Sequence, residues 1–518
     1  MPSKKGYQII VENNEKTSVT ENYCSNISWF VFITCTILSL FLVISIPTMF
    51  FPNNRCLTLD INVLSNVTVN NIIQSSAEHV NCTGKYIYVL DLPSKFNTDL
   101  LENCSSINPW KDICALLGNS GLGEKIRVTS KDDIKVFSGS NWYDTDQFSS
   151  EVIFHSRMKQ YKCLTNDYSE ASAVFVPFYS GLDVGRYLWT TNATLRDGTA
   201  KELVEFLTQR PEWKRFGGRD HFLIAGRITW DFSRTSENLS TPDGWGNHLL
   251  DLPEMKNVTS LLLEASPTSK SEIGIPYPTY FHPETLTEVD SWQNQIRRKN
   301  RPYLFSFAGA PRPNIKESIR NLLIDQCLAA AKHGVCNFLH MNPDVKPVTI
   351  MSVFQQSDFC LQPPGDSYTR KSTFDSILAG CIPVFFHPGS AYVHYIWHLP
   401  KNYSSYSVFI PMNDLMSGNV SIEKTLSRIP KYRVKAMREE VIKLIPRIVY
   451  ANPNSNVVDD SFEDAFEVAV QGVLNRVERL KSEINGSNYE SVIPNELAWK
   501  YKFFGDLDNH DWDKYFGY

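Results

Sequence analysis

Short apolar segments alternate with amphipathic segments along most of the chain beyond residue 85. The apolar segments are rich in β-branched and aromatic residues and are apolar throughout, which is typical of strands covered on both faces of a parallel sheet. Eight segments are therefore predicted as strands: 85–93, 171–181, 221–226, 303–310, 335–341, 358–365, 381–386 and 407–411.

Helical patterns lie between these strands, at 152–161, 200–210, 315–333 and 367–380. Strands that alternate with helices predict an α/β fold with doubly wound parallel sheets. The polar segment 292–302 ends in proline and divides the pattern into two halves. We therefore predict two Rossmann-like domains that face a cleft, an N-terminal domain at 85–300 and a C-terminal domain at 301–455. Residues 456–518, with a long helical pattern at 460–484, should form a C-terminal helix and tail that pack back on the domains.

No charged residue occurs between Ile27 and Phe51, a run long enough to cross a bilayer as a helix of about 20 residues. A cleaved signal peptide is the alternative, but its apolar region is usually only about 7–15 residues long and ends at small residues. We predict a cytosolic tail at 1–27, a transmembrane anchor at 28–51 and a lumenal stem at 52–84, which is rich in Asn, Ser, Thr and Val.

Orientation follows from Asn-X-Ser/Thr sequons, because N-glycans are added on the lumenal side. Nine sequons follow the predicted anchor: Asn66, Asn81, Asn103, Asn192, Asn238, Asn257, Asn402, Asn419 and Asn485. They predict a single-pass type II topology. Nine cysteines also follow the anchor, so disulfides are expected, and the odd number leaves at least one thiol free or bonded to another chain.

Composition indicates a globular protein and gives no sign of a nucleic-acid partner. The 518 residues are 42% hydrophobic and 21% charged, which is typical of a globular chain of about two to four domains. The formal net charge is −5, so no basic excess indicates a nucleic-acid partner.

One short stretch, PPGDSYTRKS at 363–372, combines a turn with cations at a predicted helix start. A helix start offers unpaired N–H groups and the positive end of the helix dipole, so an arginine there is unfavourable unless an anion binds nearby. Gly365 would let a phosphate approach the backbone, and Asp366 or Ser367 could cap the helix. Arg370 could bind a diphosphate with its planar guanidinium group, while Asp375 could accept a hydrogen bond from a ribose hydroxyl. The alternative is a turn with solvated charges.

The segment GDSYTRKSTFDSILAGCIPVFF (365–386) resembles the C-terminal motif of the plant exostosin-like proteins of glycosyltransferase family 47, especially the xyloglucan galactosyltransferases. FHSRMKQYKC, DHFLIAGRITWDFSR, IGIPYPTYFHP and FSFAGAPRPN are also similar to that group, so the resemblance covers nearly all of 85–475. It implies a GT-B fold and a Golgi membrane enzyme that inverts the donor's anomeric configuration. The implied donor is UDP-galactose or another UDP-sugar such as UDP-galacturonate, and the implied acceptor is xyloglucan.

The resemblance also implies that the domain at 85–300 binds the acceptor and the domain at 301–455 binds the nucleotide sugar, and it implies particular residues and partners. Arg312 of the FAGAPR motif and Arg370 become diphosphate ligands, Asp375 becomes a ribose contact, and Gly365, Asp366 and Ser367 line the phosphate turn. Many relatives have glutamate where this chain has Asp375. No metal or other cofactor is expected, and other Golgi glycosyltransferases are candidate partners.

An inverting transfer needs a general base on the acceptor side. Asp231 is the favoured candidate because it lies past the carboxyl end of the strand predicted at 221–226. Asp183 and His155 are weaker candidates. Asp220 and His221 are more simply read as a cap or ion pair at the strand's start, and an ion pair with Arg227 or Arg234 also remains an alternative for Asp231 itself.

Two further features leave alternatives open. Aromatic side chains could stack on sugar faces or pack in the core: Tyr179, Tyr187, Trp189, Trp230 and Trp245. Three pairs match the DxD pattern of metal-dependent transferases: Asp144 with Asp146, Asp506 with Asp508, and Asp511 with Asp513. A membrane-anchored lectin without catalysis would share the anchor, sequons and aromatics but would not need Arg312, Arg370 and Asp375.

Overall fold

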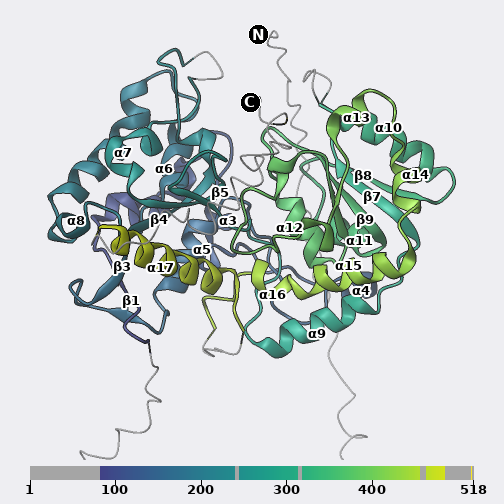
Figure 1. The fold of residues 1–518 in the computed structure, drawn as a ribbon, viewed down its shortest axis with the longest axis horizontal. Helices are drawn as coiled ribbons and strands as arrows, with labels where there is room; N and C mark the ends of the chain where they lie inside the picture. Colours follow the sequence, from purple (N-terminus) through teal and green to yellow (C-terminus); the bar gives the residue numbers. More distant parts are fainter. Residues whose placement is uncertain (1–81, 240–243, 313–317, 456–461, 485–514, 516–518) are drawn as a thin grey trace, which may run out of the picture. The chain divides into compact units, whose positions relative to one another are not determined.

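The computed structural model describes residues 82–239, 244–312, 318–455, 462–484 and 515. The described residues belong to one compact unit that contains two parallel β-sheets (Figure 1). The predicted tail, the anchor and nearly all of the stem lie outside the described residues. Within the described ranges, no helix combines the length and hydropathy needed to span a bilayer.

The first sheet has six strands in the order β2-β1-β3-β4-β5-β6, and all of its pairings are parallel. Its strands are β1 (Tyr86–Val89), β2 (Leu164–Thr165), β3 (Ala171–Phe175), β4 (His221–Ile228), β5 (Thr259–Glu264) and β6 (Glu272–Gly274). Three of these strands were not predicted. β2 and β6 are too short to show a pattern, and β5 reads TSLLLE, in which leucine favours a helix as much as a strand.

α-Helices of this domain connect β1 with β2 and β3 with β4, as crossovers between parallel strands usually do. The α-helices are α2 (Thr98–Glu102), α3 (Cys114–Leu117), α5 (Ser150–Met158), α6 (Ser180–Tyr187), α7 (Ala193–Gln209) and α8 (Pro211–Phe216). The 3₁₀ turns are η1 (Ser94–Phe96), η2 (Cys104–Ser106), η3 (Asn119–Gly121), η4 (Thr229–Asp231), η6 (Leu249–Asp251) and η7 (Pro253–Lys256).

The second sheet has five strands in the order β11-β10-β9-β7-β8, again all parallel. Its strands are β7 (Tyr303–Gly309), β8 (Cys336–His340), β9 (Ser357–Gln362), β10 (Ile382–Phe385) and β11 (Val408–Phe409), each within a few residues of a predicted strand. The chain therefore has the two parallel-sheet α/β domains that the sequence predicted.

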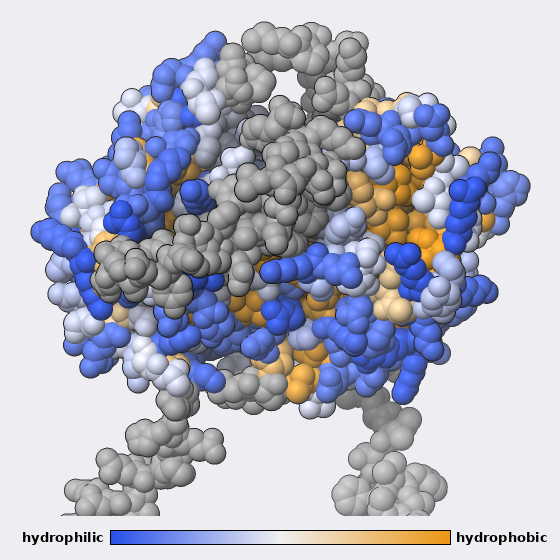
Figure 2. Space-filling model, viewed as in Figure 1, coloured by the Kyte–Doolittle hydropathy of each residue, from blue (hydrophilic) through white to orange (hydrophobic). Residues whose placement is uncertain are grey.

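The helices that accompany the second sheet are α10 (Arg320–Ala331), α11 (Pro347–Gln355), α12 (Lys371–Leu378), α13 (Met412–Met416), α14 (Ile422–Ser427), α15 (Lys431–Lys443) and α16 (Ile445–Ile448), with 3₁₀ turns η8 (Pro388–Ser390) and η9 (Tyr403–Ser405). Pro446 in the first turn of α16 separates α15 from α16, because proline lacks the N–H that a continuous helix needs. Figure 2 shows a mostly hydrophilic face, with a hydrophobic area around β8 and α13.

The segment 292–302, where the boundary between the two domains was predicted, includes the end of a helix. Its first six residues complete α9 (Leu286–Arg297), which buries Val289, Trp292 and Ile296 at helical spacing. Trp292 packs with Trp142, and its indole N–H donates to the Leu378 carbonyl at 2.9 Å. With α4 (Lys131–Val136), which contacts α11, α9 therefore packs in the core of the second sheet.

The C-terminal helix α17 (Ala465–Ile484) returns to the first sheet, where it contacts β3 (Figure 1). Its buried Phe466 packs against Phe154 with ring centroids 4.6 Å apart. The chain thus crosses from the second sheet back to the first, and this covalent return ties the two halves together.

Four disulfides join eight of the nine cysteines that follow the predicted anchor: Cys82–Cys163, Cys104–Cys114, Cys327–Cys336 and Cys360–Cys381. The ninth, Cys56, lies outside the described residues. The pairing agrees with the expectation that an odd count leaves one thiol over.

Candidate functional site

A cavity of about 780 Å³ lies between the two sheets and is lined by residues from both. The first sheet contributes the end of β4 and the turn η4. The second contributes the end of β7 and the loop that leads from β9 into α12. Ligands of open parallel sheets bind beyond the carboxyl ends of the strands, and this cavity lies at that edge of both sheets.

The loop before α12 holds most of the predicted donor residues. Gly365, Asp366, Ser367, Arg370 and Asp375 all line the cavity. The predicted cap is wrong, however: the N-cap of α12 is Arg370, whose side chain makes no capping bond. Since neither Asp366 nor Ser367 caps it, the start of α12 keeps the positive end of its dipole without a side-chain cap.

Three arginines surround this helix start. Arg370 is joined by Arg312 and by Arg320, the first residue of α10. Burial, with the two neighbouring arginines as the next causes, lowers the pKa of Arg370 to about 9, because low dielectric and like charges both disfavour the charged form. One Nη of Arg370 is buried without a partner, while the other donates to the Ala308 carbonyl at 3.4 Å. The cluster is therefore short of negative charge.

The only carboxylate that ion-pairs with this cluster in the described part of the chain is Asp366, at 3.2 Å from Arg312. Asp366 is 77% exposed, so water screens the pair and leaves it weak. Gly365 permits close approach here, since a Cβ at this position would lie 3.0 Å from a terminal nitrogen of Arg320. The cluster can therefore accept a multiply charged anion beside the backbone of the turn.

A carboxylate from the other sheet holds the turn in place. Glu264, the last residue of β5, accepts from the Ser367 hydroxyl, the Thr369 amide and the Thr369 hydroxyl, each at 2.7 Å. Tyr277 adds a hydroxyl contact to Thr369 at 3.0 Å. Because Glu264 is buried and comes from the first sheet, it fixes the turn of the second sheet relative to the first.

Asp375 lines the cavity but is already engaged. Both of its carboxylate oxygens accept from the Lys371 ammonium, at 2.9 and 3.0 Å. Lys371 also lies 3.3 Å from the centre of the Tyr280 ring. Burial raises the pKa of Asp375, and the ion pair with Lys371 opposes that rise. A ribose hydroxyl would have to share Asp375 with Lys371, which a carboxylate's four lone-pair positions allow.

The opposite wall contains Asp231, at the end of η4. Its carboxylate accepts from the Trp245 indole N–H at 2.6 Å and lies 3.5 Å from the Arg227 guanidinium. Burial raises the pKa of Asp231, and both contacts oppose that rise. Gly246, at φ +81°, allows the backbone to pass close by, because a Cβ there would meet the Asp231 carbonyl oxygen at 2.6 Å. A buried carboxylate with a raised pKa suits a proton acceptor.

The weaker base candidates do not line this cavity. Asp183 is buried and ion-pairs with Arg186 on the same helix. His155 bonds the Tyr179 hydroxyl at 2.8 Å, and burial lowers its pKa to about 4. Asp220 and His221 bond each other at 2.8 Å at the start of β4, opposite the strand end that meets the cavity, in agreement with their simpler reading.

Glu151 is a buried carboxylate that the sequence did not single out. Its two oxygens accept from the backbone amides of Gly181, Leu182 and Gly226 at 2.8 to 3.0 Å. Burial raises its pKa to about 7 despite these bonds. Glu151 thereby joins the start of α6 to β4 immediately before Arg227, so it supports the wall that carries Asp231.

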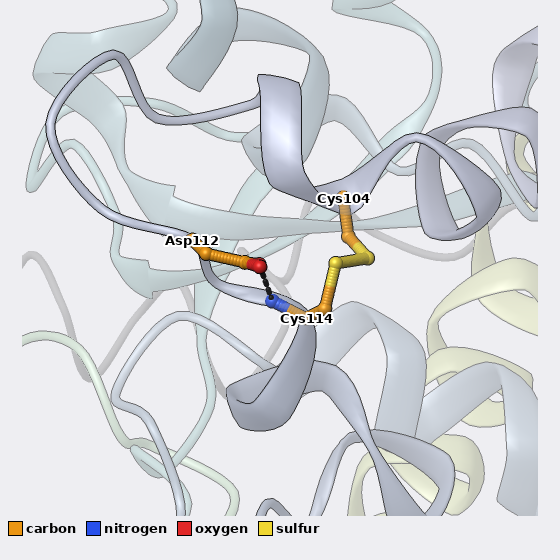
Figure 3. Close-up of side chains that lie close together, drawn as sticks. All are labelled: Cys104, Asp112 and Cys114. Carbon is orange, nitrogen blue, oxygen red and sulfur yellow. Dashed lines mark hydrogen bonds between the residues drawn. A yellow bond between two sulfur atoms is a disulfide. The ribbon is translucent and has the colours of Figure 1, made fainter.

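Metal-ligand geometry is weak in the described part of the chain. One group of three candidate ligands lies close together, Cys104, Asp112 and Cys114, with ligand atoms within 4.8 Å of one another. Figure 3 shows that the two cysteines form a disulfide and that Asp112 accepts from the Cys114 amide, so no thiolate is available. Of the DxD pairs, Asp144 and Asp146 do not line the cavity, and the other two pairs lie outside the described residues.

The family model described as "Exostosin GT47 domain" matches residues 81–426, which include both walls of the cavity. The chain belongs to the exostosin GT47 family. This is a family of glycosyltransferases, and the match agrees with the resemblance found in the sequence.

Curated relatives extend the match over most of the chain. Xyloglucan galactosyltransferase MUR3 of Arabidopsis thaliana is 52% identical over 442 residues, 84% of this chain and 70% of that protein. Xyloglucan-specific galacturonosyltransferase 1 of the same plant is 41% identical over 401 residues, 77% of this chain and 58% of that protein. Among solved structures, the α,α-trehalose 6-phosphate synthase of Burkholderia multivorans aligns at 9% identity and a TM-score of 0.33, covering 77% of this chain and 99% of that chain.

Two residues of the site were missed by sequence reasoning. Arg320 is the first residue of α10, but the helical pattern was predicted to begin at residue 315, so Arg320 did not stand out as a cation at a helix start. Glu264 ends a strand that was not predicted, and no spacing in the sequence connects it with residues 367–369.

Proposed function

We propose that this exostosin GT47 glycosyltransferase is an inverting enzyme that transfers galactose from UDP-galactose onto xyloglucan side chains. The observation that carries the proposal is the arginine cluster: Arg320 and Arg370 lie at two helix starts and face Asp231 across one cavity, and Arg312 lies beside them. The names of the relatives support the sugar and the acceptor.

The arginine wall suits the donor's diphosphate. Arginine forks bind phosphate oxygens with two parallel bonds, and the uncapped start of α12 adds its dipole. As the bond between the anomeric carbon and the diphosphate breaks, negative charge grows on the leaving oxygen. Arg370 is buried and already short of partners, so it can stabilise that charge without first breaking a strong ion pair.

The Asp231 wall suits the acceptor. In the proposed step, the Asp231 carboxylate takes the proton of an acceptor hydroxyl while that oxygen attacks the anomeric carbon from the face opposite the diphosphate. The new glycosidic bond forms as the bond to the diphosphate breaks, UDP leaves, and the configuration inverts. The Trp245 indole N–H orients the carboxylate, which is the part that a third group plays beside a catalytic base.

The donor sugar is the least constrained part of the proposal. A galacturonosyl donor would bring a carboxylate that needs a cation. The lysine that lines the cavity, Lys371, is bonded to Asp375. That pairing favours a neutral sugar, whereas the relative named as a galacturonosyltransferase supports the alternative.

Transfer assays on the purified lumenal part would test the proposal directly. The protein would be incubated with xyloglucan oligosaccharides and, separately, UDP-galactose, UDP-glucose or UDP-galacturonate. Mass and linkage of the products would be measured. Galactose added with inverted configuration is the expected result. If transfer occurred only from UDP-galacturonate, the transferred sugar would be galacturonate and not galactose. If none of the three donors supported transfer, the proposed function would be rejected.

We also propose that transfer needs no metal ion, because arginines and helix starts meet the phosphate charge. Activity should persist in EDTA. Complete loss that manganese restores would promote Asp144 and Asp146 as metal ligands.

We propose further that the enzyme is a single-pass type II protein of the Golgi membrane, where other glycosyltransferases are candidate partners. Support comes from five sequon asparagines that are exposed in the structure, Asn103, Asn192, Asn238, Asn402 and Asn419, and from four disulfides, which suit an oxidising lumen. Asn257 is half-buried, and its amide donates to the Gly217 carbonyl, so it is the least accessible of the described sequons. Endoglycosidase should increase mobility on a gel, and protease added to sealed vesicles should remove only the short tail.

A further inference from the structure

Two tryptophans near the mouth of the cavity stay exposed although indoles are costly to leave in water. Trp110 is 68% exposed and Trp189 is 59% exposed. Their ring centroids lie 4.8 Å apart, and Trp189 lies 5.2 Å from Trp245. The three indoles form a continuous row, here called the tryptophan row, that runs from the surface to the Asp231 wall, because Trp245 lines the cavity and donates to Asp231.

Arg196 holds the inner part of the row rigid. This buried guanidinium donates to the carbonyls of Tyr187, Leu188 and Thr190, which flank Trp189. It also donates to the Gly244 carbonyl at 2.8 Å, immediately before Trp245. One side chain thus binds together the two backbone segments that carry Trp189 and Trp245.

The Cys104–Cys114 disulfide holds the outer end. It closes the loop that carries Trp110, as Figure 3 shows for its two ends. Inside the loop, Ile107 is buried, and the Asn108 side chain accepts from the Trp110 amide at 2.9 Å. A disulfide and a buried arginine therefore hold apolar rings in place on the surface, and such an arrangement is preorganised for a ligand.

We propose that the tryptophan row binds the neutral glucan backbone of the polysaccharide acceptor and leads it to Asp231. This inference rests on the proposed function. Flat apolar rings match the C–H faces of neutral sugar rings. The charged pair beside the row, Arg186 with Asp183, is internally neutralised, so nothing in that pair selects an acidic chain. Continuity with the cavity through Trp245 places the row on the acceptor side.

The test compares a polymer with a short acceptor. Trp110→Ala and Trp189→Ala should each raise KM for xyloglucan polymer roughly 2- to 10-fold, with a larger rise in the double variant. KM for a xyloglucan oligosaccharide too short to reach Trp110 should stay unchanged in Trp110→Ala, and UDP affinity should stay unchanged in all of these variants. The matched control is Tyr432→Ala, which removes an aromatic that is 78% exposed on α15 in the other domain.

Two further arms separate other occupants. The sequons at Asn103 and Asn192 lie near the row, so Ser105→Ala with Thr194→Ala removes both glycans and leaves all three indoles. Polymer KM in this variant should equal that of the wild type. Tryptophan effects that vanish in this background would mean that the protein's own glycans occupy the row, and would overturn the proposal. Affinity electrophoresis in gels containing xyloglucan or polygalacturonate should show retardation by xyloglucan only, and equal retardation by both would overturn the choice of a neutral chain.

The outcomes also separate this inference from the proposed function. If the wild type transfers sugar to xyloglucan but the tryptophan variants behave like Tyr432→Ala, the row is not an acceptor platform and the function stands. If the wild type transfers nothing to xyloglucan, the function itself fails. The exposed positions of both tryptophans make folding defects improbable, and melting temperatures measured alongside would identify any that occur.

Discussion

The C-terminal wall of the cavity carries Arg320 and Arg370 at two helix starts, with Arg312 beside them, whereas the N-terminal wall carries one buried carboxylate held by an indole and a guanidinium. On the first wall, burial and neighbouring arginines lower the pKa values of Arg370 and Arg320. On the second, burial raises the pKa of Asp231. On both walls, burial disfavours the charged form: the guanidinium of Arg370 and the carboxylate of Asp231.

This difference shows how one cavity can separate binding from chemistry. The clustered cations repel one another, and a bound diphosphate would relieve that repulsion, so the first wall favours donor binding. A buried carboxylate with a raised pKa becomes a better proton acceptor, so the second wall gains in the transition state. Variants of the two walls should therefore fail in different ways.

The largest effect is expected for Asp231→Asn. The amide cannot take a proton, so transfer should slow by roughly 10²–10⁴-fold while UDP affinity stays close to that of the wild type. Initial rates and UDP titration measure the two quantities. Asp91→Asn, an exposed aspartate after β1, is the control. Near-normal turnover by Asp231→Asn would exclude it as the base and redirect attention to Asp183 and His155.

Arg370→Ala should come next. Losing a charge-assisted contact of about 1.5–3 kcal/mol should weaken UDP binding by roughly 10- to 100-fold, and transfer should fall with it. Arg370→Lys should rescue little, because an ammonium lacks the planar fork. Arg433→Ala, an exposed arginine on α15, serves as the control. UDP affinity that does not change in Arg370→Ala would move the diphosphate away from this wall.

Glu264→Gln tests the contact that joins the walls. The amide keeps one acceptor oxygen but loses the charge that three donors share, so the melting temperature and UDP affinity should both fall, by about 1.5–3 kcal/mol in stability. Tyr277→Phe removes a single neutral contact to Thr369 and should cost only about 0.5–1.5 kcal/mol. If both variants behave alike, Glu264 does not hold the turn more firmly than Tyr277.

The smallest effect concerns pH. Activity should decline as pH falls, because protonated Asp231 cannot accept a proton. The Trp245 N–H favours the charged carboxylate, so Trp245→Phe should raise the pKa of Asp231 further and move the acidic limb of the kcat/KM profile to higher pH. A smaller aromatic ring remains in the tryptophan row, so polymer KM should rise less than in Trp189→Ala. An acidic limb that stays in place would show that this bond does not tune the base.

Much of the fold followed from local patterns. Each of the strands β7 to β11 was predicted within a few residues because strands of a parallel sheet covered by helices are continuous apolar runs. β5 escaped because its leucines fit a helix equally well, and α9 escaped because its buried residues at helical spacing are separated by polar ones. Local pattern identifies an element when one secondary structure alone explains it.

The candidate site residues also divide into those that a local pattern predicted and those whose roles rest on the family resemblance. Arg370 was found because a cation at a helix start contradicts the helix dipole within a single turn, and Asp231 because it follows the end of an apolar strand. The roles of Arg312, Gly365, Asp366, Ser367 and Asp375 remain predictions, although all but Arg312 line the cavity. Local order along the chain therefore determined where a phosphate site and a base could lie.

Only the tertiary structure brought distant residues together. Glu264 meets Thr369, and Trp110 meets Trp189, across 105 and 79 positions in sequence, through side chains that carry no shared local pattern. Such contacts depend on how two sheets and a disulfide-closed loop pack, and packing is set by the whole chain. The sequence by itself determined the two parallel α/β domains and the cations at a helix start, and folding decided which carboxylate holds the turn before α12 and which indoles lie in a row beside Asp231.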